Sequence, residues 1–362
     1  MAISKNKTVP NLDSVEMISS IDKENMARLL TSFPEQCREA LSIGERAELK
    51  DLAQKKYANI VFTGLGGSAI GADMVNGYLH KEMKLPLFVN RNYVLPGFVD
   101  AQSLVFAVSY SGNTEETLAA YEVALKRDAT IIVITSGGKL EELASKNGNA
   151  LITIPKGYPP RCALGYSFIP AIIALSKLGL AKDKKDIIKK AIDFLETLKT
   201  EKLAPEVANE NNISKSIASK IFGTFSTIYA SETLGSVATR WRGQLAENAK
   251  TLSSAHVFPE MNHNEIVGWV NPRKMLDNFT AIILKDVDDQ PRIKKRMDIT
   301  ASILKNEGFS VLELESQGEN FLERMLSLVY TGDFVSFYLS ILNGIDPTPV
   351  ERITYLKKRL AE

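Results

Sequence analysis

Three hydroxyl side chains, those of Ser109, Ser111 and Thr114, lie within the six-residue segment SYSGNT. The segment follows an apolar run, SLVFAV, and leads directly into a helical pattern, TEETLAAYEVALKR. A helix N-terminus presents unpaired N–H groups and a partial positive charge, so it attracts anions. Gly112 lets the backbone approach a ligand closely, and the turn contains no lysine or arginine. Although a ligand-free helix cap uses similar residues, three hydroxyls at one strand exit favour a site for the phosphate of a small sugar.

A second turn, GLGGSA, spans residues 64–69 and fits the pattern G-x-G-x-x-A of dinucleotide-binding proteins. That fingerprint also needs an acidic residue about 20 positions further on, at the end of the next strand. The next strand here ends in VNRN, which has no carboxylate, so nicotinamide binding is disfavoured. The alternative without a ligand is that Gly66 and Gly67 only make a tight turn.

Motifs for several other chemistries are incomplete. The segment SGGKL around Lys139 lacks the first glycine and the final Ser/Thr of a P-loop, and GGSAI around Ser68 lacks the last glycine of a nucleophile elbow. The two cysteines and three histidines have no metal-ligand spacing: Cys37, Cys162, His80, His256 and His263. We therefore expect no metal and no cofactor.

The composition indicates a globular protein, in which any anion would be bound locally. With 44 basic and 43 acidic residues among 362, it gives no electrostatic reason to bind nucleic acid or an anionic membrane. The N-terminal segment MAISKNKTVPNLDS has no apolar core, so it is not a signal peptide, and no run approaches the length needed to cross a bilayer. We expect a reduced, cytoplasmic setting.

The pattern of apolar residues predicts an α/β protein with mostly parallel sheets, because β-branched runs alternate with helical ones. A Lys- and Glu-rich helical segment, 182–212, predicts the connection between two domains, 1–200 and 201–362. The first 50 residues read as irregular and carry no recognisable chemistry. Strands are expected at 59–65, 85–92, 103–110, 129–136, 150–155, 220–226, 279–286 and 310–316. Helices are expected at 71–83, 114–127, 139–147, 168–180, 231–250, 291–307, 320–342 and, opened by prolines, 347–362.

Four segments, GLGGSAIGADM, SYSGNTEETL, ITSGGKLEEL and GYPPRCALGYSF, together resemble the sugar isomerase (SIS) domain. Two later segments, RWRGQLAENAK and PEMNHNEIVGW, resemble the bifunctional phosphoglucose/phosphomannose isomerases, and the resemblance extends from about residue 55 to the C-terminus. It implies two three-layer αβα SIS domains. It also implies an enzyme that interconverts glucose 6-phosphate, and mannose 6-phosphate, with fructose 6-phosphate.

The resemblance also implies a set of site residues. Arg161 would stabilise the developing enediolate at the reacting end of the substrate. An ion pair is the alternative role for this arginine. The phosphate would be held by Ser109, Ser111 and Thr114, with Gly66, Gly67 and Ser68 lining the site.

Catalytic residues are expected in the second half of the chain. Glu247 would move a proton between C2 and C1 through a cis-enediol, and His263 would open the sugar ring. The resemblance places this histidine in the neighbouring subunit's active site, so that a homodimer is required. Lys357, rather than the adjacent Lys358, would assist ring opening or stabilise the oxyanion, and Thr348 would make room for either epimer at C2. Taken singly, such residues are more often surface or packing groups.

Two alternative functions stay open at this stage. The first is a non-catalytic sugar-phosphate sensor built on the same domains, although the first 50 residues do not resemble a DNA-binding helix-turn-helix. The second is an isomerase of an amino-sugar or pentose phosphate. The lack of metal-ligand spacing argues against the zinc-dependent, cupin-type phosphomannose isomerases.

Overall fold

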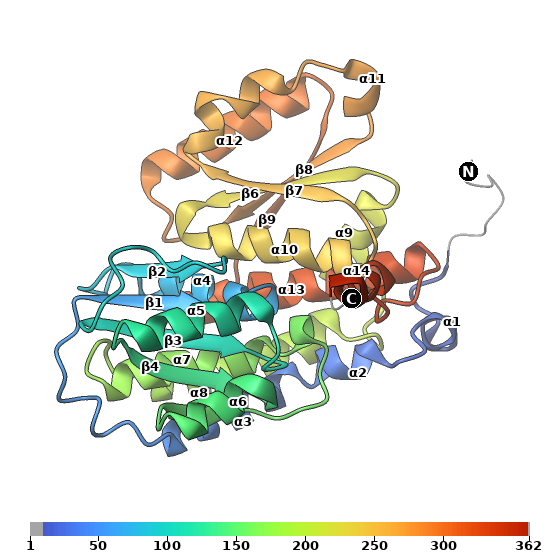
Figure 1. Cartoon of the computed structure of the whole chain (residues 1–362). Coiled ribbons are helices and arrows are strands. Elements are labelled where there is room, and N and C mark those ends of the chain that lie inside the picture. Colours follow the sequence, from blue (N-terminus) through green and yellow to red (C-terminus); the bar gives the residue numbers. More distant parts are fainter. Residues whose placement is uncertain (1–9, 361–362) are drawn as a thin grey trace. The chain divides into compact units, whose positions relative to one another are not determined.

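The computed structural model describes residues 10–360 (Figure 1). These residues form two compact units, each built around one parallel sheet, which confirms the predicted α/β class. The five-strand unit comprises Ser32–Phe194 and Asn320–Glu323. The four-strand unit comprises the described residues up to Thr31, Leu195–Glu319 and the described residues from Arg324 onward. The division into domains 1–200 and 201–362 stays a prediction.

The sheet of the five-strand unit has the order β2-β1-β3-β4-β5, and all its strand pairs are parallel. Its inner strands β3 and β4 are buried along their whole length. Continuous β-branched and apolar runs produce such strands because helices cover both faces of a parallel sheet. The five strands are those predicted: β1 (Asn59–Thr63), β2 (Leu87–Asn90), β3 (Ser103–Ser109), β4 (Thr130–Thr135) and β5 (Ala150–Thr153).

Helices pack on the two faces of this sheet. Side chains alternate between the faces along each strand, so Val61, Val105 and Val133 share one core with α5 (Glu115–Lys126) and α6 (Gly138–Lys146). Phe62 and Phe106 stack with ring centroids 4.4 Å apart. The remaining helices are α3 (Phe33–Arg46), α4 (Gly67–Leu79), η1 (Pro160–Cys162), α7 (Leu164–Lys177) and α8 (Lys185–Leu198), and α7 packs against both α3 and α4.

The sheet of the four-strand unit has the order β7-β6-β8-β9, again with parallel pairs. Figure 1 shows α10 (Gly235–Glu247) and α12 (Pro291–Asn306) on opposite sides of it. One core lies under α12, where Met297, Ala301 and Leu304 meet Tyr229 and Ile283. The strands are β6 (Phe225–Ser231), β7 (Ser253–Phe258), β8 (Phe279–Lys285) and β9 (Ser310–Glu315).

Further helices complete the description. The long helix α13 (Phe321–Leu342) contacts α10 through a buried ion pair, in which the Arg240 guanidinium meets the Asp333 carboxylate at 2.7 Å. The shorter elements are α1 (Val15–Ile21), α2 (Met26–Thr31), η2 (Lys199–Leu203), α9 (Ile213–Ile221), η3 (Glu232–Leu234), η4 (Glu260–His263), η5 (Glu265–Gly268), α11 (Arg273–Leu276) and α14 (Glu351–Leu360).

Several sequence predictions are wrong in detail. The strand expected at 220–226 is the end of α9, a turn and the start of β6; the Asn212 side chain caps α9 by accepting a bond from the Lys215 N–H. Strand β7 was not predicted, because half of its sequence SSAHVF is polar. Between residues 10 and 50 the chain forms three helices, α1, α2 and α3, so this part is not irregular as expected; residues 1–9 lie outside the described residues. The prolines at 347 and 349 precede α14 and do not form its first turn.

One described helix, α13, is long and apolar enough to cross a membrane, which contradicts the expectation that no run approaches that length. Its apolar window is fully buried in the protein, as in the core helix of a folded domain. The same helix carries the buried Asp333 that pairs with Arg240.

Candidate functional site

The two predicted phosphate turns lie at neighbouring strand ends of the five-strand unit. Strands β1 and β3 pair in parallel, with Thr63 opposite Ala107, so their carboxyl ends share one edge. The order β2-β1-β3 places a topological switch point between them, which is where open α/β sheets bind ligands. The helices α4 and α5 begin at these turns, and among the residues described no side chain caps either helix. Their first N–H groups are therefore suited to bind an anion.

The SYSGNT turn is shaped by its own hydroxyls. The Ser109 side chain is 1% exposed, and its Oγ lies 2.9 Å from Thr114 Oγ1 and accepts a bond from the Gly112 N–H at 3.1 Å. Ser111 is exposed, and its Oγ accepts a bond from the Asn113 N–H at 3.3 Å. The turn is therefore held by hydrogen bonds among its own residues, and Ser111 lies on its outer side.

A third turn, which follows β4, braces the SYSGNT turn. The Tyr110 carbonyl accepts a bond from Ser136 Oγ at 2.7 Å, and Asn113 Oδ1 accepts one from the Lys139 N–H at 2.9 Å. Gly112 has φ +69°, and a Cβ there would lie 1.7 Å from the Gly137 carbonyl oxygen. Our sequence reasoning did not assign this supporting role, although the segment TSGG follows a strand as the other two turns do.

The GLGGSA turn brings a further loop against the site. A Cβ on Gly67 would lie 2.6 Å from the Pro160 carbonyl oxygen, so only glycine permits this approach. The following residue, Arg161, is 4% exposed. Gly66 has φ +53°, and the Ser68 Oγ accepts a bond from the Tyr110 N–H at 3.3 Å. The structure thus brings together the turns that carry the six predicted phosphate-site residues, with Arg161 in the adjoining loop.

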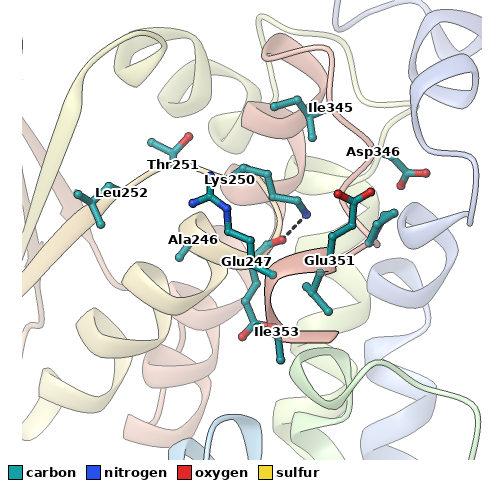
Figure 2. A pocket seen from close by; sticks show the side chains of 12 residues that line it. Ala246, Glu247, Lys250, Thr251, Leu252, Ile345, Asp346, Glu351 and Ile353 are labelled. Atoms are coloured by element: carbon teal, nitrogen blue, oxygen red, sulfur yellow. Dashed lines mark hydrogen bonds between the residues drawn. The ribbon is translucent and has the colours of Figure 1, made fainter. Parts of the chain in front are cut away.

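The remaining predicted site residues lie in the four-strand unit, where Glu247 is the last residue of α10. It lines an open cavity of about 620 Å³ together with Lys250, Asp346, Glu351 and Arg352 (Figure 2). Lys250 Nζ donates to the Glu247 carbonyl oxygen at 2.6 Å and to the Pro347 carbonyl oxygen at 2.9 Å. This lysine, which our sequence reasoning left without a role, therefore joins the end of α10 to the segment that leads into α14.

Thr348 and Lys357 follow Pro347, the residue that Lys250 links to the end of α10. The Thr348 N–H donates to Asp346 Oδ1 at 3.0 Å, so the turn before α14 is folded on itself. Lys357 and Lys358 are both exposed on α14, a helix that has no buried residue. The choice of Lys357 over Lys358 stays a prediction.

His263 lies far from Glu247 within one chain. Glu247 ends α10 just before β7 begins at Ser253, whereas His263 follows the other end of β7 at Phe258. The two residues are therefore separated along the direction of β7, whose six residues span about 20 Å at ~3.3 Å per residue. His263 is exposed. One copy of the chain therefore does not bring this pair together.

Within residues 10–360, no group of three or more His, Cys, Asp or Glu side chains is arranged to hold a metal ion. The two cysteines in that range are buried thiols, and burial raises the pKa of Cys37 far above its usual value. The predicted site residues offer hydroxyl, backbone N–H, carboxylate, imidazole, ammonium and guanidinium groups.

Two protein families match the chain in the regions just described. The SIS domain matches residues 51–156, and the bacterial phospho-glucose isomerase C-terminal SIS domain matches residues 210–360. A glucose-6-phosphate isomerase like protein from Thermus thermophilus has a TM-score of 0.65 at 17% identity, covering 95% of this chain and 99% of its own, so it shares the fold. Fold and site together define a protein with two SIS domains.

Relatives with established descriptions narrow the class further. The chain is 45% identical over 332 residues to the bifunctional phosphoglucose/phosphomannose isomerase of Caldicellulosiruptor bescii, covering 91% of this chain and 97% of that protein. The protein of the same description from Aquifex aeolicus is 38% identical, with 86% and 94% covered. A D-glucosamine-6-phosphate 4-epimerase from Sulfolobus acidocaldarius is 32% identical, with 75% and 88% covered. This chain belongs to the family of bifunctional phosphoglucose/phosphomannose isomerases.

Proposed function

We propose that this protein interconverts glucose 6-phosphate and mannose 6-phosphate with fructose 6-phosphate, in the cytoplasm and without a metal or organic cofactor. The observation that carries the proposal is the pair of uncapped helix N-termini at the β1/β3 switch point, beside three hydroxyls. Such a site binds one phosphoryl group through N–H and O–H donors. Membership in the isomerase family supports the choice of a hexose phosphate as substrate.

The phosphate is assigned to the SYSGNT turn, with Ser109, Ser111 and Thr114 around it. The sugar then undergoes two proton operations. His263 opens the ring by moving a proton between the ring oxygen and O1, assisted by Lys357. Glu247 next removes the proton from C2 and returns it to C1 through a cis-enediol, and the Arg161 guanidinium stabilises the negative charge that develops on the enediolate.

Both epimers at C2 give the same cis-enediol once the proton on C2 has been removed. One carboxylate can therefore serve glucose 6-phosphate and mannose 6-phosphate if the hydroxyl on C2 is accommodated in either orientation. We assign that role to Thr348, in the turn that Lys250 joins to the end of α10. The joint supports this assignment because it relates Thr348 to the backbone of Glu247.

We also propose that the working form is a homodimer with shared active sites. Glu247 and His263 lie at opposite edges of one sheet. A second copy related by a two-fold axis can place its own His263 beside the Glu247 of the first, and the reciprocal pair forms at the same time. The exposed position of His263 is compatible with such an exchange.

The activity test compares turnover of the two aldose phosphates in the presence of EDTA. Glu247→Gln keeps the size of the side chain but removes the base, so we expect kcat to fall by about 10² to 10⁴ for both substrates. The matched control is Glu122→Gln on the exposed side of α5, which should retain wild-type turnover. Unchanged turnover in Glu247→Gln would refute the proton-transfer role. Loss of wild-type turnover in EDTA would refute metal-free catalysis.

The same assay addresses the two alternative functions. A sugar-phosphate sensor would bind fructose 6-phosphate and turn over neither aldose phosphate. Glucosamine 6-phosphate is the informative third substrate, because one relative is described as an epimerase of that compound. We expect kcat/KM to be highest for the unsubstituted hexose phosphates.

A further inference from the structure

A series of hydrogen bonds connects the segment that carries His263 to the sheet of the four-strand unit. Trp269 Nε1 donates to the Tyr229 hydroxyl at 2.9 Å, and that hydroxyl donates to Glu265 Oε1 at 2.6 Å. The second carboxylate oxygen, Glu265 Oε2, lies 3.0 Å from His256 Nδ1. Tyr229 is 0% exposed and Trp269 is 5% exposed, so the series begins in the core of the four-strand unit and ends at its surface.

We define residues 260–268 as the His263 segment. Of the residues linked by these hydrogen bonds, Glu265 is the one that belongs to this segment. Tyr229 and His256 stand opposite each other on the adjacent strands β6 and β7. Burial, and then the neighbouring carboxylate, raises the pKa of the Tyr229 hydroxyl, so it remains a donor over the working range of pH. A hydrogen bond to a carboxylate is about twice as strong as one between neutral groups. The Glu265 carboxylate thus ties the segment to two strands of the sheet.

The rest of the segment is held by short polar contacts. Asn262 Nδ2 donates to Thr300 Oγ1 on α12 at 3.0 Å, and Asn264 Nδ2 donates to Glu260 Oε1 at 2.9 Å. Asn264 Oδ1 also accepts a bond from the Glu265 N–H at 2.6 Å. These contacts lie on both sides of His263, whose own side chain is exposed. The backbone of the segment is therefore anchored while the imidazole stays accessible.

We propose that Glu265 is a positioning residue for His263: its carboxylate, held by Tyr229 and His256, sets the direction in which the imidazole is presented to the sugar ring. The inference rests on the ring-opening role proposed for His263. Ring opening needs the imidazole within hydrogen-bond reach of the ring oxygen and O1, and a misplacement of about 1 Å can cost 10²-fold in rate. Glu265 itself does not touch the substrate in this proposal.

A double-mutant cycle tests the proposal. Glu265→Ala should lower kcat at least tenfold in the otherwise intact enzyme, while Glu265→Gln, which still accepts from Tyr229, should lower it less. If Glu265 acts only through His263, then Glu265→Ala combined with His263→Asn should be no slower than His263→Asn alone. An equal loss in both backgrounds, or wild-type kcat in Glu265→Ala, would overturn the proposal. The cycle remains valid if Glu265→Ala is poorly folded, because Glu265→Gln replaces it.

Mixed dimers separate this inference from the shared-site proposal. The reference pair is Glu247→Gln with His263→Asn, for which random pairing should restore about a quarter of the wild-type activity, in one intact site of each mixed dimer. Glu265→Ala should also be rescued by Glu247→Gln and should not be rescued by His263→Asn. Rescue by His263→Asn would show that Glu265 serves the Glu247 side instead. Failure of the reference pair alone would count against the shared site, and the double-mutant cycle would then decide on Glu265.

Discussion

At the scale of single residues, Gly67 is a position of the predicted site that has no room for a side chain. Its missing side chain lets the Pro160–Arg161 backbone approach α4, and a Cβ would lie 2.6 Å from the Pro160 carbonyl oxygen, a distance that real Cβ atoms do not adopt. The neighbour is backbone and cannot rotate away as a side chain can. The identity of this residue therefore controls where the buried Arg161 stands.

We expect Gly67→Ala to lower kcat/KM at least tenfold for both aldose phosphates, because a displacement of Arg161 by even 1 Å removes charge stabilisation from the enediolate. Enzyme kinetics, with a thermal melt to register any loss of stability, provide the measurement. The control is Gly97→Ala, since a Cβ on Gly97 meets nothing within 4 Å. Equal kinetics in the two variants would show that the close approach has no bearing on catalysis.

At the scale of secondary-structure elements, β9 is joined to its neighbours by charge. Glu313 on β9 pairs with Lys285 on β8, and its Oε1 lies 2.5 Å from Lys305 Nζ on α12. Hydrogen bonds from these two lysines lower the pKa of Glu313. Although burial disfavours the charge of Lys285, its bonds to Asp298 and Glu313 raise its pKa overall. One carboxylate thus secures an edge strand and the helix that covers it.

These ion pairs predict that the contribution of Glu313 to the free energy of unfolding decreases at acidic pH. Because the pKa of Glu313 is lower in the folded state, its contribution is present above the unfolded value of about 4.3 and is lost as pH falls through the folded value. Glu313→Gln should lower the free energy of unfolding at pH 7 by of order 1 kcal/mol and flatten its decline between about pH 5 and 3. Urea denaturation across that range is the measurement, with Glu122→Gln as control. An unchanged decline would contradict the prediction.

At the scale of the whole molecule, the proposal of shared sites predicts that activity depends on dimer assembly, because β7 lies between Glu247 and His263. We expect specific activity to fall on dilution in step with the dissociation of dimers into monomers, followed by mass photometry at the same concentrations. The physical reason is that a single chain holds these two groups at opposite edges of one sheet. A monomer that retains full specific activity would contradict the proposal of shared sites.

The sequence predicted the five-strand unit better than the four-strand unit, for physical reasons. The apolar runs of β3 and β4 are long, buried and β-branched, so they cannot be mistaken for surface. Strand β7, with the sequence SSAHVF, lies at the edge of its sheet and carries polar side chains there, so periodicity does not reveal it. The shift from the expected strand at 220–226 to β6 has a related origin, because Ser226, Thr227 and Ser231 interrupt the apolar residues of FSTIYAS.

Some candidate site residues could be recognised from the sequence and others could not. The SYSGNT and GLGGSA turns are recognisable because strand, glycine turn and helix are contiguous in sequence. Lys250 and Glu265 escaped attention because their partners, Pro347 and Tyr229, are distant along the chain and meet them only in the folded protein. The roles of Glu247, His263, Lys357 and Arg161 stay predictions until the variants are measured.

The contact between Gly112 and Gly137 has a consequence for how this enzyme can change. A Cβ at Gly112 would lie 1.7 Å from the Gly137 carbonyl oxygen, so neither loop can be reshaped without the other. An evolving lineage that admits a bulkier anion must therefore alter both loops in concert, through intermediates that are worse than either endpoint. The same constraint applies to an engineer who randomises one loop alone.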